Sequence, residues 1–426
     1  MKGSLFKNFL SLAGAEAFSK VITFAAFAII ARLCGPAGFG YIEWAGALLM
    51  CASLVVDQGF SSYGAREIAK APGRTAELVN VIVTARVVLA GIGFIAVLTF
   101  AFAWVNDPLV RMLVIAYGLS LWGLPFLFQW VFQGHEKMNL AAVTQVIRQT
   151  VFVITVLVFV KGTDSVVWAG IAETAGVVAA AVFSIWMYQR YFAGGAAIRP
   201  AFSKQLFNEG TPIGLSQLFW VVKMFGATLV VGLIATPEDT GYFAGAMRIL
   251  VAVHTFVWLY YFNLLPSMSR EWKKGAEKLA SLIGNSMKIV LPGSIIAAAI
   301  WIAFAPTAMA IAFGPNFIAG ATALRWMAGV CMLAAVSGHY RFGLIAAGRQ
   351  KDEMLTSAVG AVTALILIPL GYSNAGIGGA AAALFIAETV TLLSAWYLSR
   401  QRLFSPRPAA AKVCDEHLGG LPEASV

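Results

Sequence analysis

The chain has 426 residues, of which 60% are hydrophobic and 12% are charged, and its mean hydropathy is +0.80. This composition excludes a water-soluble globular protein, in which about a quarter of the residues are usually charged. A formal net charge of +10 would favour a nucleic-acid partner for a soluble protein, but in a membrane chain the position of the charges decides their meaning.

The first two apolar runs lie on either side of a short turn. They extend from about Asn8 to Leu33 and from Tyr41 to Gly64, with the segment CGPAGFG between them. Each reaches the roughly 20 residues that a helix needs to cross about 30 Å of hydrocarbon, so we predict an out-and-back pair of membrane helices. The first run also contains Glu16 and Lys20 and is too long for the apolar region of a signal peptide, so we expect it to be retained.

Ten further apolar runs follow along the chain. They are continuous rather than alternating, which favours membrane helices over the strands of a membrane β-barrel. We place them at about 80–104, 110–132, 139–160, 165–188, 210–235, 242–265, 286–308, 320–346, 354–371 and 376–399. The sequence therefore predicts an all-α polytopic membrane protein with about twelve transmembrane helices.

The polar connections alternate between two kinds. One set, with the two ends of the chain, holds about nineteen Lys and Arg residues, whereas the other holds Arg111 and Lys161. By the positive-inside rule the basic connections and both termini face the cytoplasm, so the net charge reflects topology and we do not expect nucleic acid as a partner. The weakly charged connections are all short. They leave no room outside the membrane for a catalytic domain, and we expect a protein that is not an enzyme.

Three short matches recur in the same order in the second half of the chain. They are IAET at 171–174 and 386–389, GHEK and GRQK at 134–137 and 348–351, and Gly40–Tyr41 with Gly241–Tyr242. Their offsets are 215, 214 and 201 residues. An internal repeat of this kind predicts two parallel six-helix lobes, at 1–200 and 201–400, with a substrate path between them. A cytoplasmic, disordered tail would follow at 401–426.

Charged side chains inside the predicted spans are candidates for function, because a charge at the bilayer centre costs roughly 2.5 to 3.5 kcal/mol. The deep cations are Lys20, Arg86, Arg148, Lys223, Arg248 and Arg325, and the acids are Glu16, Asp57, Glu173 and Glu388. Four more charged residues lie near span ends, where snorkelling explains them: Arg32, Glu43, Lys288 and Arg341. Six deep cations against four acids leave a positive excess. A cavity lined by such an excess would bind an anionic substrate, and Arg is well suited to phosphate.

Alternative interpretations stay open for the acids. Glu16 and Lys20 are spaced i and i+4, so they can pair on one helix face. Glu173 and Glu388 are matched across the repeat, and they can either couple transport to ions or hydrogen-bond between closely packed helices. The four cysteines have no spacing typical of metal ligands, so we expect neither a metal site nor a cofactor.

Three stretches of the chain carry a resemblance to a known family. They are ARLCGPAGFGYIEWA at 31–45, DQGFSSYGAREIAK at 57–70 and FGLIAAGRQKDEM at 342–354. Through them, residues 5–400 resemble the polysaccharide flippases of the multidrug/oligosaccharidyl-lipid/polysaccharide exporter superfamily. The resemblance implies a twelve-helix transporter that works by alternating access. It would move an undecaprenyl-pyrophosphate-linked oligosaccharide, such as an O-antigen or exopolysaccharide repeat unit, from the cytoplasmic to the outer leaflet of a bacterial inner membrane. A polysaccharide polymerase and chain-length proteins would be its partners.

Other functions predict different sequence features. A multidrug exporter of the same superfamily would favour buried acids over buried cations, and a peptidoglycan lipid flippase usually has two more helices. A membrane-bound polysaccharide polymerase or ligase should have a large outside loop. A scramblase-like or purely structural membrane protein would not explain the deep cations. The sequence leaves open which glycan is moved, the oligomeric state, and whether protons, sodium or the membrane potential energise transport.

Overall fold

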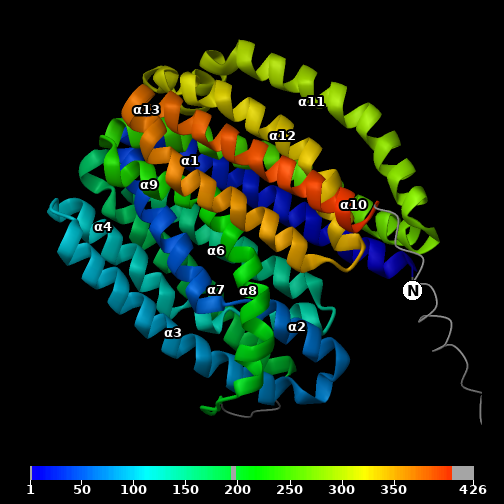
Figure 1. Cartoon of the computed structure of the whole chain (residues 1–426). Coiled ribbons are helices and arrows are strands. Elements are labelled where there is room, and N and C mark those ends of the chain that lie inside the picture. Colours follow the sequence, from blue (N-terminus) through cyan, green and yellow to red (C-terminus); the bar gives the residue numbers. More distant parts are fainter. Residues whose placement is uncertain (1, 193–197, 405–426) are drawn as a thin grey trace, which may run out of the picture.

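A computed structural model describes the backbone of residues 2–192 and 198–404, and side chains from residue 21 onward except at 212, 213, 216, 217 and 220. The described part of the chain consists of consecutive helices joined by short connections (Figure 1). The first half contains α1 (Lys2–Asp57), α2 (Phe60–Lys70), η1 (Pro72–Arg74), α3 (Thr75–Trp104), α4 (Pro108–Leu119), η2 (Ser120–Trp122), η3 (Leu124–Phe126), α5 (Gln129–Gly134), α6 (Met138–Phe159), η4 (Thr163–Ser165) and α7 (Val167–Tyr191). The expected tail lies almost entirely outside the described residues.

The second half has fewer but longer helices. It contains α8 (Lys204–Met224), α9 (Gly226–Ile234), α10 (Pro237–Lys274), α11 (Ala276–Phe313), η5 (Pro315–Gly320), α12 (Ala321–Ala346) and α13 (Gln350–Arg402). Helices α10 and α11 extend beyond the predicted spans at 242–265 and 286–308, because they continue through the basic connection as far as Gly275. Gly275 separates them with φ +127°, a backbone conformation that other residues rarely adopt.

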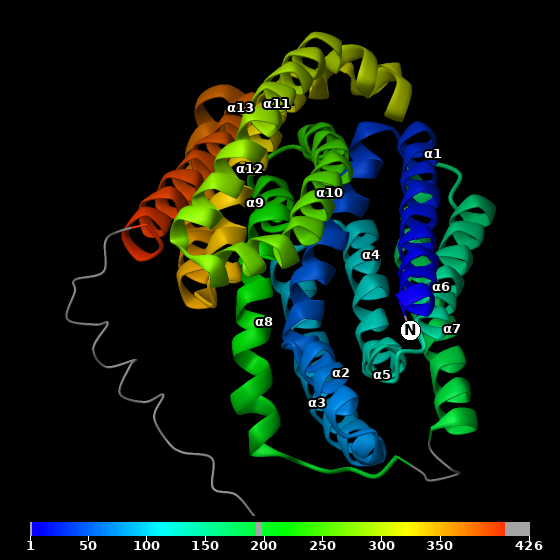
Figure 2. The same ribbon diagram turned by 90° about the vertical axis from the view of Figure 1, so that its right-hand side faces the viewer.

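The longest helices, α1 and α13, are each folded into two limbs. Gly35 (φ 65°) precedes Pro36 in α1, and Ala375 and Gly376 (φ 56°) leave helical geometry in α13. Figure 2 shows the two limbs of α1 running side by side. In α13 the limbs approach so closely that a Cβ at Gly371 would lie 2.3 Å from the Gly379 carbonyl oxygen. The turns predicted at 34–40 and 372–376 are therefore present.

Nine helical segments among the described residues are long and apolar enough to cross a membrane. Two of them, Val21–Lys70 and Gln350–Arg402, contain the folded limbs, and a shorter apolar segment at Val221–Ile234 ends in α9. The prediction of an all-α polytopic membrane protein is confirmed. The count of about twelve spans stays a prediction, as does the division into lobes at residue 200.

The buried hydrophobic residues form one cluster at one end of the bundle and two clusters at the other end. One large cluster takes in residues 26–56, 90–121, 152–172, 227–250, 305–331 and 364–387, so it draws on both halves of the chain and surrounds the six weakly charged connections. At the basic connections there are two clusters instead. One contains buried residues at 60–85, 128–141 and 187–188, with Leu206 at the start of α8, and the other contains Met268, Leu279, Ile283, Leu344 and Leu403. We call these the joined end and the basic end; the two halves of the chain share a core at the first and have separate cores at the second.

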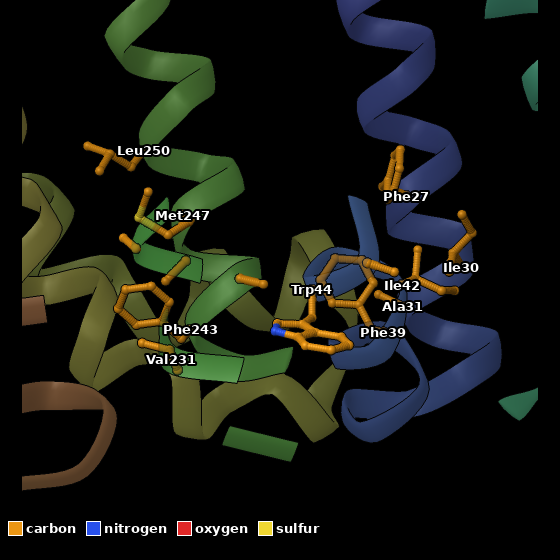
Figure 3. Packing of buried hydrophobic residues seen from close by; sticks show 14 of the residues in the cluster. Phe27, Ile30, Ala31, Phe39, Ile42, Trp44, Val231, Phe243, Met247 and Leu250 are labelled. Atoms are coloured by element: carbon orange, nitrogen blue, oxygen red, sulfur yellow. The ribbon is translucent and has the colours of Figure 1, made fainter. Parts of the chain in front are cut away.

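Helices α1 and α10 make the central contact of the joined end. A Cβ at Gly40 would lie 2.1 Å from the Pro237 carbonyl oxygen, and a Cβ at Gly241 would lie 2.0 Å from that of Pro36. The contact is thus reciprocal between residues that the repeat aligns at an offset of 201. Beside it, Trp44 donates its indole N–H to the Leu229 carbonyl at 3.2 Å, and Figure 3 shows this ring between the α1 residues and those of α9 and α10.

Candidate substrate path and its ion pairs

The most buried ion pair joins three helices of the second half. Lys223 Nζ of α8 lies 2.6 Å from Glu388 Oε2 of α13, and the two side chains are 6% and 2% exposed. Ser337 of α12 donates its hydroxyl to Glu388 Oε1 at 3.1 Å. Hydrogen bonds of this kind offset part of the cost of taking two charges out of water.

A second buried pair joins α1, α2 and α3 in the first half. Arg86 donates to Asp57, and it also donates to Ser61 Oγ at 2.5 Å. Asp57 accepts in turn from the Ser61 backbone N–H at 3.2 Å, so the carboxylate also stabilises the first turn of α2. Arg86 Nε is buried and has no hydrogen-bond partner among the described residues.

A third pair, Arg148 of α6 with Glu173 of α7, holds two adjacent helices together. These helices approach closely, because a Cβ at Gly176 would lie 2.6 Å from the Arg148 carbonyl oxygen. Glu173 therefore makes a contact between helices, and that contact is an ion pair with Arg148. The Arg148 side chain is 28% exposed, more than that of Arg86, Lys223 or Arg248.

The fourth pair connects the two halves of the chain. Arg248 of α10 donates its Nε–H to Glu43 of α1 at 2.5 Å, and its guanidinium carbon lies 3.1 Å from the centre of the Phe27 ring. Phe27 stands on the other limb of α1 (Figure 3). Arg248 is therefore held between both limbs, and the geometry adds a cation–π contact to the ion pair.

The positive excess that the sequence predicts is smaller among the described side chains, where Arg325 is the one deep cation without a carboxylate partner. Each of the four cations above has a carboxylate partner, and Arg341, which we had attributed to snorkelling, pairs with Glu353 at 2.5 Å. The count of acids omitted Glu43 because it lies near a span end. Its partner is 205 residues away, and no sequence spacing indicates such a pair.

Of the remaining candidate residues, Arg325 is the one with a described side chain, and it has no contact with these pairs among the described residues. Arg325 lies in the second turn of α12, close to the joined end, and is exposed. Lys20 and Glu16 have backbone in α1, but their side chains lie outside those that the structure describes. Whether any of the candidates contacts a substrate stays a prediction.

Two hollows occur elsewhere on the molecule. One, of about 470 Å³, lies between α1 and α11 and includes Arg32, a residue that we had attributed to snorkelling. The other, of about 430 Å³, is lined by α10 residues from Phe256 to Leu264. The five deep cations whose side chains the structure describes line neither of these two hollows.

At the basic end, the described contacts between the halves involve α2 and α8. Arg66 lies 2.8 Å from Glu209, the rings of Phe60 and Phe207 have their centres 5.3 Å apart, and a Cβ at Gly214 would lie 2.3 Å from the Gln58 carbonyl carbon. Helix α8 thus begins against the first half and ends at Glu388 of the second half. It connects the two where their cores are separate.

Comparison with known proteins identifies the family of the chain. A family model described as “Polysaccharide biosynthesis protein” matches residues 5–272, which is more than half of the chain. The chain belongs to this family. The resemblance expected from the sequence is confirmed.

One curated relative is similar to part of this chain, and two solved structures are similar to most of it. A protein of Escherichia coli (strain K12) named “Putative O-antigen transporter” is 21% identical over 252 residues, which are 58% of this chain and 61% of that protein. An inward-facing multidrug resistance MATE family transporter of the MOP superfamily has a TM-score of 0.72 at 18% identity, with 91% of this chain and 94% of that chain covered. The lipid II flippase MurJ, in an inward closed conformation, also has a TM-score of 0.72, at 12% identity, with 91% and 87% covered. At these identities the structures show a shared fold.

Proposed function

We propose that this protein is a flippase that moves an undecaprenyl-pyrophosphate-linked oligosaccharide from the cytoplasmic to the outer leaflet of a bacterial inner membrane, for polysaccharide biosynthesis. The observation that carries the proposal is the divided core. In a chain of this family, two halves that share one core at one end and have separate cores at the other form the arrangement that alternating access requires. The relative named for O-antigen transport supports the choice of a glycan.

The distribution of charge indicates the orientation of the protein in the membrane and thus the direction of transport. The basic end holds most of the Lys and Arg residues, so by the positive-inside rule it faces the cytoplasm and both termini lie there. The halves are therefore separate on the side where lipid-linked sugars would be loaded. The described state corresponds to uptake of substrate.

Arg148 is the cation that we propose to contact the headgroup first. It is the most exposed of the four paired cations, and its Nε is buried without a hydrogen-bond partner among the described residues. An arriving pyrophosphate can take over part of the guanidinium from Glu173, because Arg offers donors in two directions. Protonation of Glu173 would favour that exchange, which gives the acid a role in ion coupling.

The membrane potential can drive the step. If the headgroup crosses with about two uncompensated negative charges, an inside-negative potential of about 100 mV favours export by roughly 4.6 kcal/mol. The polyprenyl chain would remain in lipid while the halves rock. A polymerase and chain-length proteins would then use the unit on the outer face.

An export role for organic cations fits the ion pairs less well. Glu43, Glu173 and Glu388 each have a cationic partner, so none of these described acids is available for a positively charged drug. A polymerase would need chemistry outside the membrane, where the connections are short.

The test uses cells that lack this protein and assays labelled lipid-linked oligosaccharide on each face of the inner membrane. We expect the unit to accumulate on the cytoplasmic leaflet and to reach the outer leaflet again when the chain is restored. An Arg148→Ala variant should not restore it, whereas Lys161→Gln, which removes an exposed charge at the joined end, should. Units that reach the outer leaflet normally without the protein would contradict the proposal.

A further inference from the structure

The hollow between α1 and α11 lies on the seam between the two halves at the joined end. It has a volume of about 470 Å³ and its walls are apolar except at Arg32. Four alanines make the space, Ala25 and Ala28 on α1 and Ala308 and Ala312 on α11, and Phe and Ile side chains complete the lining. Figure 1 shows α11 along the edge of the bundle.

The dimensions of the hollow suit a hydrocarbon chain. Its α1 residues run from Phe24 to Arg32, which at 1.5 Å per residue is about 12 Å along the helix, close to the roughly 15 Å depth of one leaflet. It is open to lipid, because Ile29 is 38% exposed and Ile311 is 71% exposed. The hollow therefore runs from the end of the bundle toward the middle of the membrane.

Arg32 stands at the end of the hollow nearest the turn. It is exposed, and it donates one N–H to the Ile311 carbonyl oxygen at 2.5 Å. Among the described residues Arg32 has no carboxylate within ion-pair distance, in contrast to the paired arginines of the interior. The rest of its guanidinium can therefore bind an anion.

We propose that this hollow binds an anionic phospholipid of the leaflet at the joined end, with one acyl chain between α1 and α11 and the phosphate on Arg32. A single guanidinium matches the single negative charge of phosphatidylglycerol, whereas a pyrophosphate carries more charge than Arg32 can balance. The hollow also lies where the halves share a core, away from the end where they are separate. Because its two walls belong to different halves, the lipid stabilises the joined arrangement.

This inference goes beyond the transport function and does not depend on it. The test titrates the full-length protein, purified in detergent, with dioleoylphosphatidylglycerol and with dioleoylphosphatidylcholine, and counts bound lipids by native mass spectrometry. We expect the anionic lipid to bind about fivefold more tightly, the effect of one cation close to an anionic headgroup. Arg32→Gln should abolish this preference. Ala25→Trp, which fills the hollow from its exposed side, should reduce the binding of both lipids.

The matched control is Arg111→Gln. Arg111 also lies at the joined end and also donates to a backbone carbonyl, that of Val105 at 2.8 Å, but it does not line the hollow. Its replacement should leave the preference unchanged. An equal loss in the two arginine variants would overturn the proposal, as would unchanged binding in Arg32→Gln. Displacement of the phospholipid by an equimolar amount of undecaprenyl phosphate would also overturn it, since the site would then belong to the transported lipid.

Discussion

Lys223 and Glu388 depend on each other because neither is in contact with water. The side chains are 6% and 2% exposed, so either charge alone would be buried without a counterion. A pair of this kind can be replaced by neutral side chains at little cost, but removing one partner leaves an uncompensated charge. In the Arg86–Asp57 pair the dependence is one-sided, because the Arg86 side chain is 4% exposed and the Asp57 side chain is 28% exposed.

We predict that Glu388→Gln lowers the free energy of unfolding by about 3 to 5 kcal/mol, because it leaves the Lys223 charge buried. The double variant Lys223→Met with Glu388→Gln should recover most of this loss. The measurement is chemical unfolding in detergent micelles for the two single variants and the double one. Asp352→Asn, which breaks the exposed pair with Arg349, is the control and should cost less than about 1 kcal/mol. A Glu388→Gln variant as stable as the parent would mean that water reaches the pair.

At the scale of helices, the joined end depends on two glycines that bring α1 and α10 together. Gly40 lies against the Pro237 carbonyl and Gly241 against that of Pro36, at distances that no Cβ can occupy. Small residues at such crossings let membrane helices approach closely enough for backbone contact. This reciprocity is what the predicted repeat would produce, because matched residues would meet where the two halves face each other.

We expect Gly40→Ala to force α1 and α10 apart, to lower thermal stability in detergent and to abolish transport. The control is Gly284→Ala on α11. A Cβ there has nothing within 4 Å, so alanine should be neutral or should stabilise the helix by up to about 1 kcal/mol. Thermal unfolding and the leaflet assay on both variants make the comparison. Equal behaviour of the two would show that the crossing tolerates a wider spacing.

Structural features with a local cause in the sequence could be predicted, whereas features that depend on packing between distant helices could not. Gly35 and Gly376 stand at the turns because the backbone requires positive φ there, and composition places the apolar runs between them. The partners of the buried charges were not predictable, because Glu43 and Arg248 are brought together by packing between halves. Arg32 looked like a snorkelling residue, since the hollow beside it is made by α11, whose approach no local pattern indicates.

For the whole molecule, the transport proposal requires two arrangements of the halves. In the described one the halves share a core at the joined end and have separate cores at the basic end, where α2 and α8 connect them. Spin labels at two exposed pairs can follow both ends in a cysteine-free background. Lys137 with Lys351 reports on the basic end, and Lys161 with Asn374 on the joined end.

We predict that double electron–electron resonance in nanodiscs shows two distances for each pair of labels. Conditions that shorten the Lys137–Lys351 distance should lengthen the Lys161–Asn374 distance, because the halves move as rigid bodies. Labels at Lys137 and Lys161, on either side of the single helix α6, serve as the control and should give one unchanged distance. A single distance for both pairs under all conditions would contradict alternating access.

The most direct measurement of the central claim is the transfer of a lipid-linked oligosaccharide by the purified chain alone. Undecaprenyl-pyrophosphate oligosaccharide with a fluorescent sugar is placed in proteoliposomes, and a membrane-impermeant quencher reports the fraction in the outer leaflet over time. We expect transfer to be much faster than in protein-free liposomes and to fall to that background with Arg148→Ala. Transfer no faster than in protein-free liposomes, from chain shown to be folded by its thermal unfolding, would contradict the account.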